Sequence, residues 1–286
     1  MILTLSDKRK LAYEEYGDPQ GTPVFFIHGA PGSRLFHPPD EVTKRQGVRL
    51  ICTDRPGYGD STFQPNRQIL DWATDIAQLA KHLGFEKFGV IGHSGGGPHA
   101  LACAYVLSEQ VTAAAIISGA GPADTPKGTD GMFFLNWLGF KIGRYTPWFF
   151  WYLLVKILLR EIAADPAKAI DRDKDSWPPS DRELLTNPEI RELCIRSDLE
   201  SYRHGLLAFA WDAHLIIRPW GFELEKIKVP THLWHGTLDN STTFTMARYM
   251  EEKIPNCKLT ICEDEAHMLL IPHWEDILVT LKQMSN

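Results

Sequence analysis

The feature that most constrains this chain is the pentapeptide Gly92-His93-Ser94-Gly95-Gly96, which stands between an apolar run and a helical one. Residues 87–94 are typical of a buried strand, and residues 98–107 of a helix. A serine on such an abrupt strand-to-helix turn needs glycine two positions to either side, because side chains there would make the backbones collide. The pattern therefore predicts a strained turn that lifts the Ser94 hydroxyl above a sheet, beside the N-terminus of a helix.

Short apolar runs alternate with helical segments along most of the chain. This alternation predicts an α/β fold with a mostly parallel sheet flanked by helices. We expect an antiparallel hairpin from residues 1–5 and 11–16. Further strands are expected over 23–29, 48–53, 87–94, 111–121, 231–236 and 258–262, and helices over 69–83, 98–107, 242–254 and 274–281.

The alternation stops near residue 122 and resumes near residue 223. We therefore predict one core made of residues 1–121 and 223–286, with residues 122–222 inserted as a helical cap. Residues 129–152 hold ten aromatic side chains, which is too dense for one buried helix stripe. We expect most of them to pack the cap and some to line a pocket. Residues 160–203 are rich in charge and are expected to form the solvated outer face of the cap.

The 286 residues carry a net charge of −6, which gives no electrostatic footprint for nucleic acid or an anionic membrane surface. A small, uncharged partner is expected. The five cysteines are odd in number and lack close spacing, so we predict neither a disulfide framework nor a metal site, and no cofactor. The N-terminus lacks a signal-peptide pattern, and the longest uncharged aromatic stretch is far shorter than the roughly 20 residues of a membrane span. We predict a cytoplasmic protein.

A serine hydroxyl becomes a good nucleophile only when a base takes its proton and a carboxylate holds that base in the right tautomer. Two downstream residues fit these roles. Asp239 follows the expected strand 231–236, and His267 follows the strand 258–262, so both are at the carboxyl ends of strands. Asp124, after the strand 111–121, is an alternative acid. The spacing predicts a Ser94, Asp239 and His267 triad.

The negative charge that develops on a substrate oxygen needs hydrogen-bond donors fixed in advance. The segment His28-Gly29-Ala30-Pro31-Gly32 follows the first parallel strand and can bring a backbone N–H to the serine. Pro31 has no N–H, so we assign the oxyanion hole to the N–H groups of Ala30 and Gly95. His28 is expected to orient this loop by hydrogen bonding rather than to react.

Five motifs together resemble the α/β-hydrolase superfamily, in its esterase-like branch with a helical cap. They are HGAPGS (28–33), DRPGYGDS (54–61), GHSGGG (92–97), WHGTLD (234–239) and EAH (265–267). The resemblance covers nearly the whole chain outside 122–222 and implies the same triad and oxyanion donors. Two positions depart from the family: Ala266 stands where glycine commonly precedes the histidine, and the acid loop 240–243 lacks the usual proline.

The resemblance implies a serine hydrolase, and the apolar cap favours a carboxylesterase for an apolar or aromatic ester. Serine at position 94 argues against the superfamily members that use aspartate or cysteine there. Two alternatives stay open. One is an aminopeptidase of the proline iminopeptidase type, in which a cap carboxylate such as Glu161 or Glu200 binds the substrate ammonium. The other is a small-molecule receptor that turns over slowly.

Overall fold

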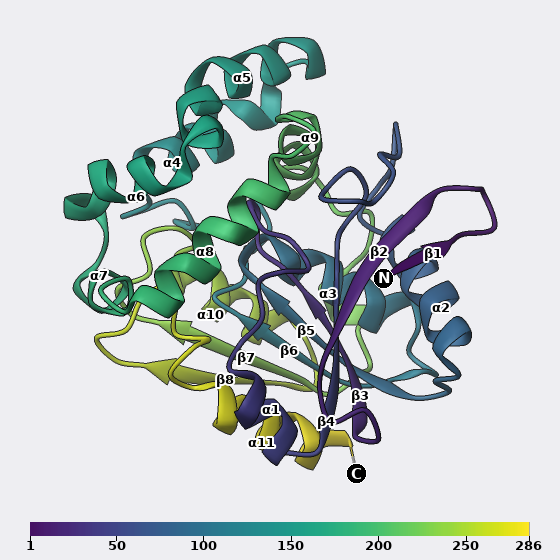
Figure 1. Cartoon of the computed structure of the whole chain (residues 1–286). Helices are drawn as coiled ribbons and strands as arrows, with labels where there is room; N and C mark the ends of the chain where they lie inside the picture. The colour runs from purple at the N-terminus through teal and green to yellow at the C-terminus, as the bar shows by residue number, and fades with distance from the viewer. Residues whose placement is uncertain (286) are drawn as a thin grey trace.

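The computed structural model describes residues 1–285, and its strands form one sheet in the order β1-β2-β4-β3-β5-β6-β7-β8 (Figure 1). The pairings of β1 with β2 and of β2 with β4 are antiparallel, and all later ones are parallel. The strands are β1 (Ile2–Thr4), β2 (Lys10–Gly17), β3 (Thr22–Ile27), β4 (Val48–Thr53), β5 (Phe88–His93), β6 (Val111–Ile117), β7 (Thr231–Gly236) and β8 (Cys257–Cys262). The predicted α/β class is confirmed.

Helices cover both faces of this sheet. Those in or beside the core segments are α1 (Asp40–Arg45), α2 (Asp71–Leu83), α3 (Gly97–Val106), α10 (Phe244–Lys253) and α11 (Trp274–Ser285). Gly84 ends α2 in the left-handed conformation that is common for glycine at the C-terminal end of a helix. The six-residue α1 was not predicted, because a helix shorter than two turns shows no clear apolar period.

Alternate side chains of each central strand enter two separate apolar cores. Phe25 and Ile27 of β3 pack with α2 and α3, whereas Val24 and Phe26 pack on the opposite face with α11. This alternation is the two-residue period of a strand, and burial on both faces explains why the parallel strands are continuous apolar runs in the sequence. Figure 1 shows α1 and α11 together on one side of the sheet.

The predicted strand 111–121 ends four residues earlier than expected, the largest such difference. Residues 111–121 were assigned to a single strand, but β6 ends at Ile117. Ser118 has a positive φ of 46°, so the chain turns out of the extended conformation at that residue. The apolar and small residues that follow are buried in the loop below the inserted segment, which is why their composition resembled a strand.

Residues 122–222 lie between β6 and β7 and form helices and loops. The helices are α4 (Phe134–Lys141), α5 (Trp148–Ala164), α6 (Pro166–Asp173), α7 (Pro179–Leu184), α8 (Pro188–Ser201) and α9 (Leu207–Ile216). Asp165 and Asn187 cap α6 and α8 by accepting hydrogen bonds from backbone N–H groups in the first turn. These helices stand over one end of the sheet (Figure 1). Within residues 1–285, no helix is both long and apolar enough to cross a bilayer.

Candidate active site

The turn after β5 holds Ser94 in a strained conformation. Ser94 has a φ of +53°, a region that residues with a side chain rarely adopt. A Cβ on Gly96 would lie 2.1 Å from the carbonyl oxygen of Ile27, and one on Gly92 would lie 2.7 Å from that of Gly96. Both glycines are therefore required by close backbone approach, for the steric reason that the sequence suggested.

The structure brings Ser94, His267 and Asp239 into one hydrogen-bonded chain. His267 Nε2 is 2.8 Å from Ser94 Oγ, and His267 Nδ1 is 2.8 Å from Asp239 Oδ2. The three residues come from the loops after β5, β7 and β8, which all end at the same edge of the parallel sheet. Since an ionised carboxylate only accepts, Nδ1 donates to Asp239, and Nε2 is free to accept the serine proton.

The Asp239 carboxylate stabilises the imidazolium form of His267. Burial opposes a charge on His267, but the Asp239 carboxylate and its hydrogen bond outweigh burial, and the pKa lies above the ordinary 6.5. Burial likewise opposes ionisation of Asp239, whereas the His267 charge and hydrogen bond hold its pKa below the ordinary value. Asp239 also accepts the N–H groups of Ser241 and Thr242, at 2.8 and 3.0 Å. The imidazole of His267 can therefore accept the proton of the Ser94 hydroxyl and hold it on Nε2.

The alternative acid, Asp124, is not part of this chain. It is exposed and lines a different hollow from the one beside Ser94.

Two residues that the sequence did not single out hold the loop of His267. His93 Nε2 donates to the carbonyl oxygen of His267 at 3.2 Å, and burial followed by the nearby His267 charge lowers the pKa of His93 to about 3. Asp181, on α7, accepts the backbone N–H groups of His267 and Met268 at 3.1 and 2.9 Å. The inserted segment thus fixes the backbone of the candidate base through a carboxylate.

Ala30 and Gly95 lie side by side next to Ser94. A Cβ on Gly95 would be 3.3 Å from the nitrogen of Ala30, and both residues line the same cavity as the serine. Arg55, in the segment after β4, fixes the loop that carries Ala30. Its guanidinium donates to the carbonyl oxygens of His28 and of Gly29, the second at 2.8 Å. The N–H of Arg55 also donates to His28 Nε2 at 3.3 Å, which agrees with the orienting role expected of that histidine.

Arg55 is fully buried, and its charge is balanced by a carboxylate from the inserted segment. Asp212, on α9, accepts from Arg55 Nε at 2.7 Å and from the Arg67 guanidinium with its other oxygen. All three side chains are nearly inaccessible to solvent. Although burial opposes ionisation, the two arginines hold the pKa of Asp212 far below its usual range. The turn at 54–57 is therefore structural, and its arginine depends on a residue far away in the sequence.

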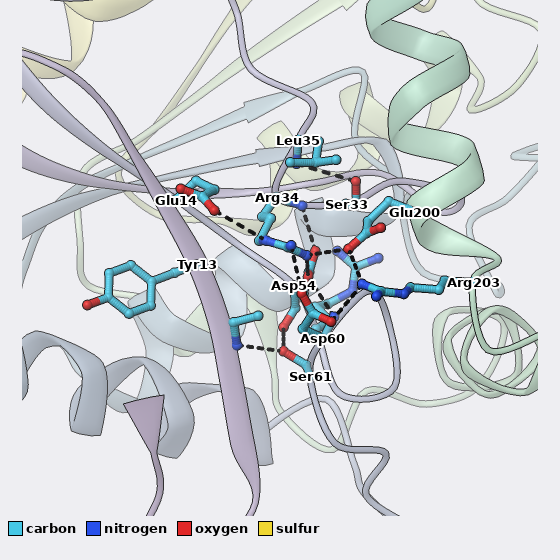
Figure 2. A network of polar contacts seen from close by, with 12 residues as sticks. Tyr13, Glu14, Ser33, Arg34, Leu35, Asp54, Asp60, Ser61, Glu200 and Arg203 are labelled. Carbon is cyan, nitrogen blue, oxygen red and sulfur yellow. Dashed lines mark hydrogen bonds and ion pairs between the residues drawn. The ribbon is translucent and has the colours of Figure 1, made fainter. Parts of the chain in front are cut away.

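A second set of ion pairs fastens α8 to the loop after Ala30 (Figure 2). Arg34 pairs with Glu200 of α8 at 2.7 Å and with Asp60 at 2.9 Å, while Arg203 reaches Asp60 from just beyond α8 at 2.7 Å. Figure 2 also shows Asp54 against the same guanidinium. Glu200 is thus engaged outside the cavity.

The hydroxyl of Ser94 opens into a cavity of about 450 Å³ between the sheet edge and the inserted segment. Most of the side chains that line it from the inserted segment are apolar; they include Phe140, Trp151, Leu154, Val155, Leu158, Leu159, Ile162, Ile170, Phe209 and Ile216. Some of the aromatic residues of 129–152 therefore face a pocket. Among residues 1–285, no group of three or more His, Cys, Asp or Glu side chains is arranged to hold a metal ion.

The expectation that charged residues of 160–203 all face solvent is wrong for three aspartates. Asp173, Asp181 and Asp198 line the cavity, and Asp173 pairs with Arg172 at 2.8 Å. Asp198 stands on α8 in line with Cys194 and Tyr202, which are four residues before and after it. Its carboxylate forms no hydrogen bond or ion pair with residues 1–285, and burial raises the pKa of Asp198 to about 7. Glu161, by contrast, is exposed and pairs with Arg172 at 3.7 Å. A sequence pattern cannot show which side of a short helix turns inward.

The fold and the motifs match one described family. Residues 22–273 match the model of the family described as alpha/beta hydrolase fold. The chain belongs to this family. The predicted resemblance is therefore confirmed.

Individual relatives either match only part of this alpha/beta hydrolase or have low sequence identity over its length. It is 38% identical over 120 residues to a proline iminopeptidase of Xylella fastidiosa, a match that covers 39% of this chain and 36% of that protein. It is 26% identical to a proline iminopeptidase of Clostridium botulinum, over 97% of this chain and 94% of the relative. A solved carboxylesterase structure from the ammonia-oxidizing Thaumarchaeon Nitrososphaera gargenis superposes with a TM-score of 0.72 at 20% identity, covering 100% of this chain and 98% of the other. That likeness concerns the fold alone.

Replacing the carboxylate of Asp239 should lower the pKa of His267. We expect the imidazole of His267 to titrate with a midpoint above 6.5. The midpoint should fall in Asp239→Asn, because burial favours the neutral imidazole and the negative charge that offsets burial is then removed. Nuclear magnetic resonance of the imidazole C–H groups measures both values. His93 serves as an internal control, since its pKa of about 3 keeps it neutral throughout the range. An unchanged His267 midpoint in the variant would contradict the assigned interaction.

Removing the charge of Asp212 should destabilise the protein strongly. Asp212→Asn leaves two buried guanidinium groups without a counter-charge, so we expect the free energy of unfolding to fall by about 3–5 kcal/mol. Urea denaturation measures the change. The matched control is Asp171→Asn, which removes a surface carboxylate paired with Arg191 and is expected to cost no more than about 0.5 kcal/mol. Equal losses in the two variants would argue against a structural role for the buried cluster.

Proposed function

We propose that this alpha/beta hydrolase is a carboxylesterase that cleaves apolar or aromatic esters through an acyl-enzyme on Ser94. The observation that carries the proposal is the hydrogen-bonded chain Ser94–His267–Asp239, with both hydrogen bonds at 2.8 Å and with Ser94 and His267 lining an apolar cavity. Residues 1–121 and 223–286 are proposed as the catalytic core, and residues 122–222 as the cap. The protein is proposed to act in the cytoplasm.

In the first half of the reaction, His267 Nε2 takes the hydroxyl proton while Ser94 Oγ attacks the ester carbonyl carbon. The carbonyl electrons move to the oxygen, and the N–H groups of Ala30 and Gly95 stabilise its negative charge. Asp239 stabilises the imidazolium. When the tetrahedral intermediate collapses, the carbon–oxygen bond to the alcohol breaks, and the alcohol leaves with the proton of His267.

The second half returns the enzyme to its starting state. His267 takes a proton from water, and the resulting hydroxide attacks the carbonyl carbon of the acyl-Ser94. The same backbone donors stabilise the second oxyanion. The bond to Ser94 Oγ then breaks, the serine recovers its proton from His267, and the carboxylic acid leaves. No external redox partner or metal takes part in these steps.

The cavity supports an apolar acyl or alcohol group. Its walls offer side chains such as Leu154, Val155 and Ile170, and few charged groups. Apolar pockets discriminate only about 10- to 200-fold per methylene, so we expect a chain-length preference rather than a single permitted substrate.

Asp198 favours a second candidate function, that of an aminopeptidase. Its carboxylate is the cavity group best suited to bind a substrate ammonium, since it has no partner among residues 1–285, whereas Glu161 and Glu200 pair with arginines elsewhere. The relatives named proline iminopeptidase point to the same class.

A fluorophosphonate should modify the protein once, on Ser94. The reagent phosphonylates a serine that is activated by a neighbouring base, so the adduct should form in the wild type and not in Ser94→Ala. Intact-mass and peptide mass spectrometry measure the number and position of adducts. Ser118→Ala, which alters a buried serine outside the triad, is the control and should still react. An adduct at another serine, or none, would overturn the assignment of the nucleophile.

Turnover of two substrate series separates the functions. We expect p-nitrophenyl esters of increasing acyl length to be hydrolysed, and proline and alanine p-nitroanilides to be left intact. Asp198→Asn should then change kcat/KM for neutral esters little. Cleavage of only the anilides with free amines, lost in Asp198→Asn, would support the aminopeptidase instead. A receptor would be stabilised by a bound ligand but would turn over neither series.

A further inference from the structure

The outer side of α4 and α5 exposes more apolar surface than a solvated helix pair needs. Phe149, Phe150 and Ile157 of α5 are 67%, 60% and 61% exposed. Further large apolar side chains are exposed on α4, α5 and the segment between them: Phe134, Trp137, Ile142, Tyr145, Leu153 and Leu158. We call these nine residues the outer face. Single exposed apolar residues are ordinary, but a concentration of this size on consecutive elements marks a site of interaction.

The outer face is part of a rigid unit rather than a loose edge. Trp151 of α5 is buried, and its indole donates to the carbonyl oxygen of Ala210 at 2.9 Å. The ring of Trp151 lies against the backbone of Gly139 and Gly143, at the end of α4 and just after it. These contacts turn the opposite sides of the helices outward. Figure 1 shows α4 and α5 at the end of the molecule farthest from the C-terminus.

Most of the charges around the outer face are positive; the exposed Glu161, near the end of α5, pairs with Arg172 at 3.7 Å. Residues 131–160 contain four basic residues, Lys141, Arg144, Lys156 and Arg160, and no aspartate or glutamate, although the whole chain has a net charge of −6. Lys141, Lys156 and Arg160 form no ion pair with residues 1–285. A local positive potential therefore accompanies the exposed aromatic and aliphatic side chains. The net charge of the whole chain, from which we expected no binding to an anionic membrane, does not show this local excess of positive charge.

We propose that the outer face binds the surface of an anionic phospholipid bilayer. A helix pair that combines exposed aromatic and aliphatic residues with unpaired lysine and arginine fits the boundary between acyl chains and acidic headgroups. The helices lie on the surface and do not cross it. A second copy of this chain is a poorer match, because pairing two such faces would bring together two sets of unpaired positive charges.

The outer face adjoins the cavity of the proposed active site. Leu158 is 40% exposed and also lines that cavity. Phe149, Phe150, Lys156 and Arg160 do not line it. Substitution of these four can therefore test membrane binding without changing the walls of the cavity, and the binding proposal does not depend on the proposed chemistry.

Sedimentation with vesicles tests the proposal on the full chain. The wild type should bind vesicles of phosphatidylcholine with about 30% phosphatidylglycerol and should bind pure phosphatidylcholine at least about tenfold more weakly. High salt should weaken binding, since exposed charges are screened. Phe149→Ser with Phe150→Ser, and separately Lys156→Gln with Arg160→Gln, should each lower the partition coefficient about tenfold or more.

Matched variants keep the test specific. Val106→Ser with Leu199→Ser removes two exposed apolar side chains elsewhere, and Lys44→Gln with Lys228→Gln removes two positive charges elsewhere. Both pairs should bind as the wild type does. Fluorophosphonate labelling of every variant separates a lost surface from a lost fold or active site.

Three results would overturn the proposal. The first is that the wild type fails to bind the acidic vesicles. The second is equal weakening by the matched variants. The third is a dimer in solution, measured by light scattering, that dissociates in Phe149→Ser with Phe150→Ser, since the outer face would then be covered by a second copy.

Discussion

The close approach of the Ser94 turn to the end of β3 is the constraint on which the rest of the site depends. At Gly96 the backbone of the turn comes so near the carbonyl of Ile27 that no Cβ fits between them. This approach places Ser94 and Gly95 beside Ala30, in the loop that follows β3. The positive φ of Ser94 is the conformational cost of the same turn. The candidate nucleophile and the candidate oxyanion donors are thus positioned by one backbone contact.

The inserted segment stabilises the site as well as covering it. Asp181 holds the backbone of His267, and Asp212 balances the charge of Arg55, which in turn fixes the carbonyl groups before Ala30. Glu200 adds an ion pair to the loop that follows. Each contact joins a loop of the sheet edge to a different helix of the segment. Because buried charges are expensive to leave unpaired, these contacts couple the packing of α7, α8 and α9 to the geometry of the site.

The same segment presents two different apolar surfaces. Its inner side lines the cavity next to Ser94, and its outer side exposes aromatic residues beside unpaired basic ones. The dense aromatic run of residues 129–152 supplies both, because successive residues of a helix point in different directions. The composition gives the number of aromatic residues, but only their positions on α4 and α5 show which of them line the cavity and which are exposed on the surface.

The sequence by itself determined the α/β class, the order of the central strands and helices, and the three residues that meet at the sheet edge. It could do so because these features are local: apolar period, strand ends, and glycines on either side of a serine. The tertiary structure alone decided that β6 ends at Ile117, that Asp181 and Asp198 face inward, and that Asp212 neutralises Arg55. The positions of Asp181 and Asp212 depend on contacts with partners more than 80 residues away, and a charge looks the same in a sequence whether it faces water or an arginine. Whether a charged side chain is buried or exposed is decided only when the chain is packed.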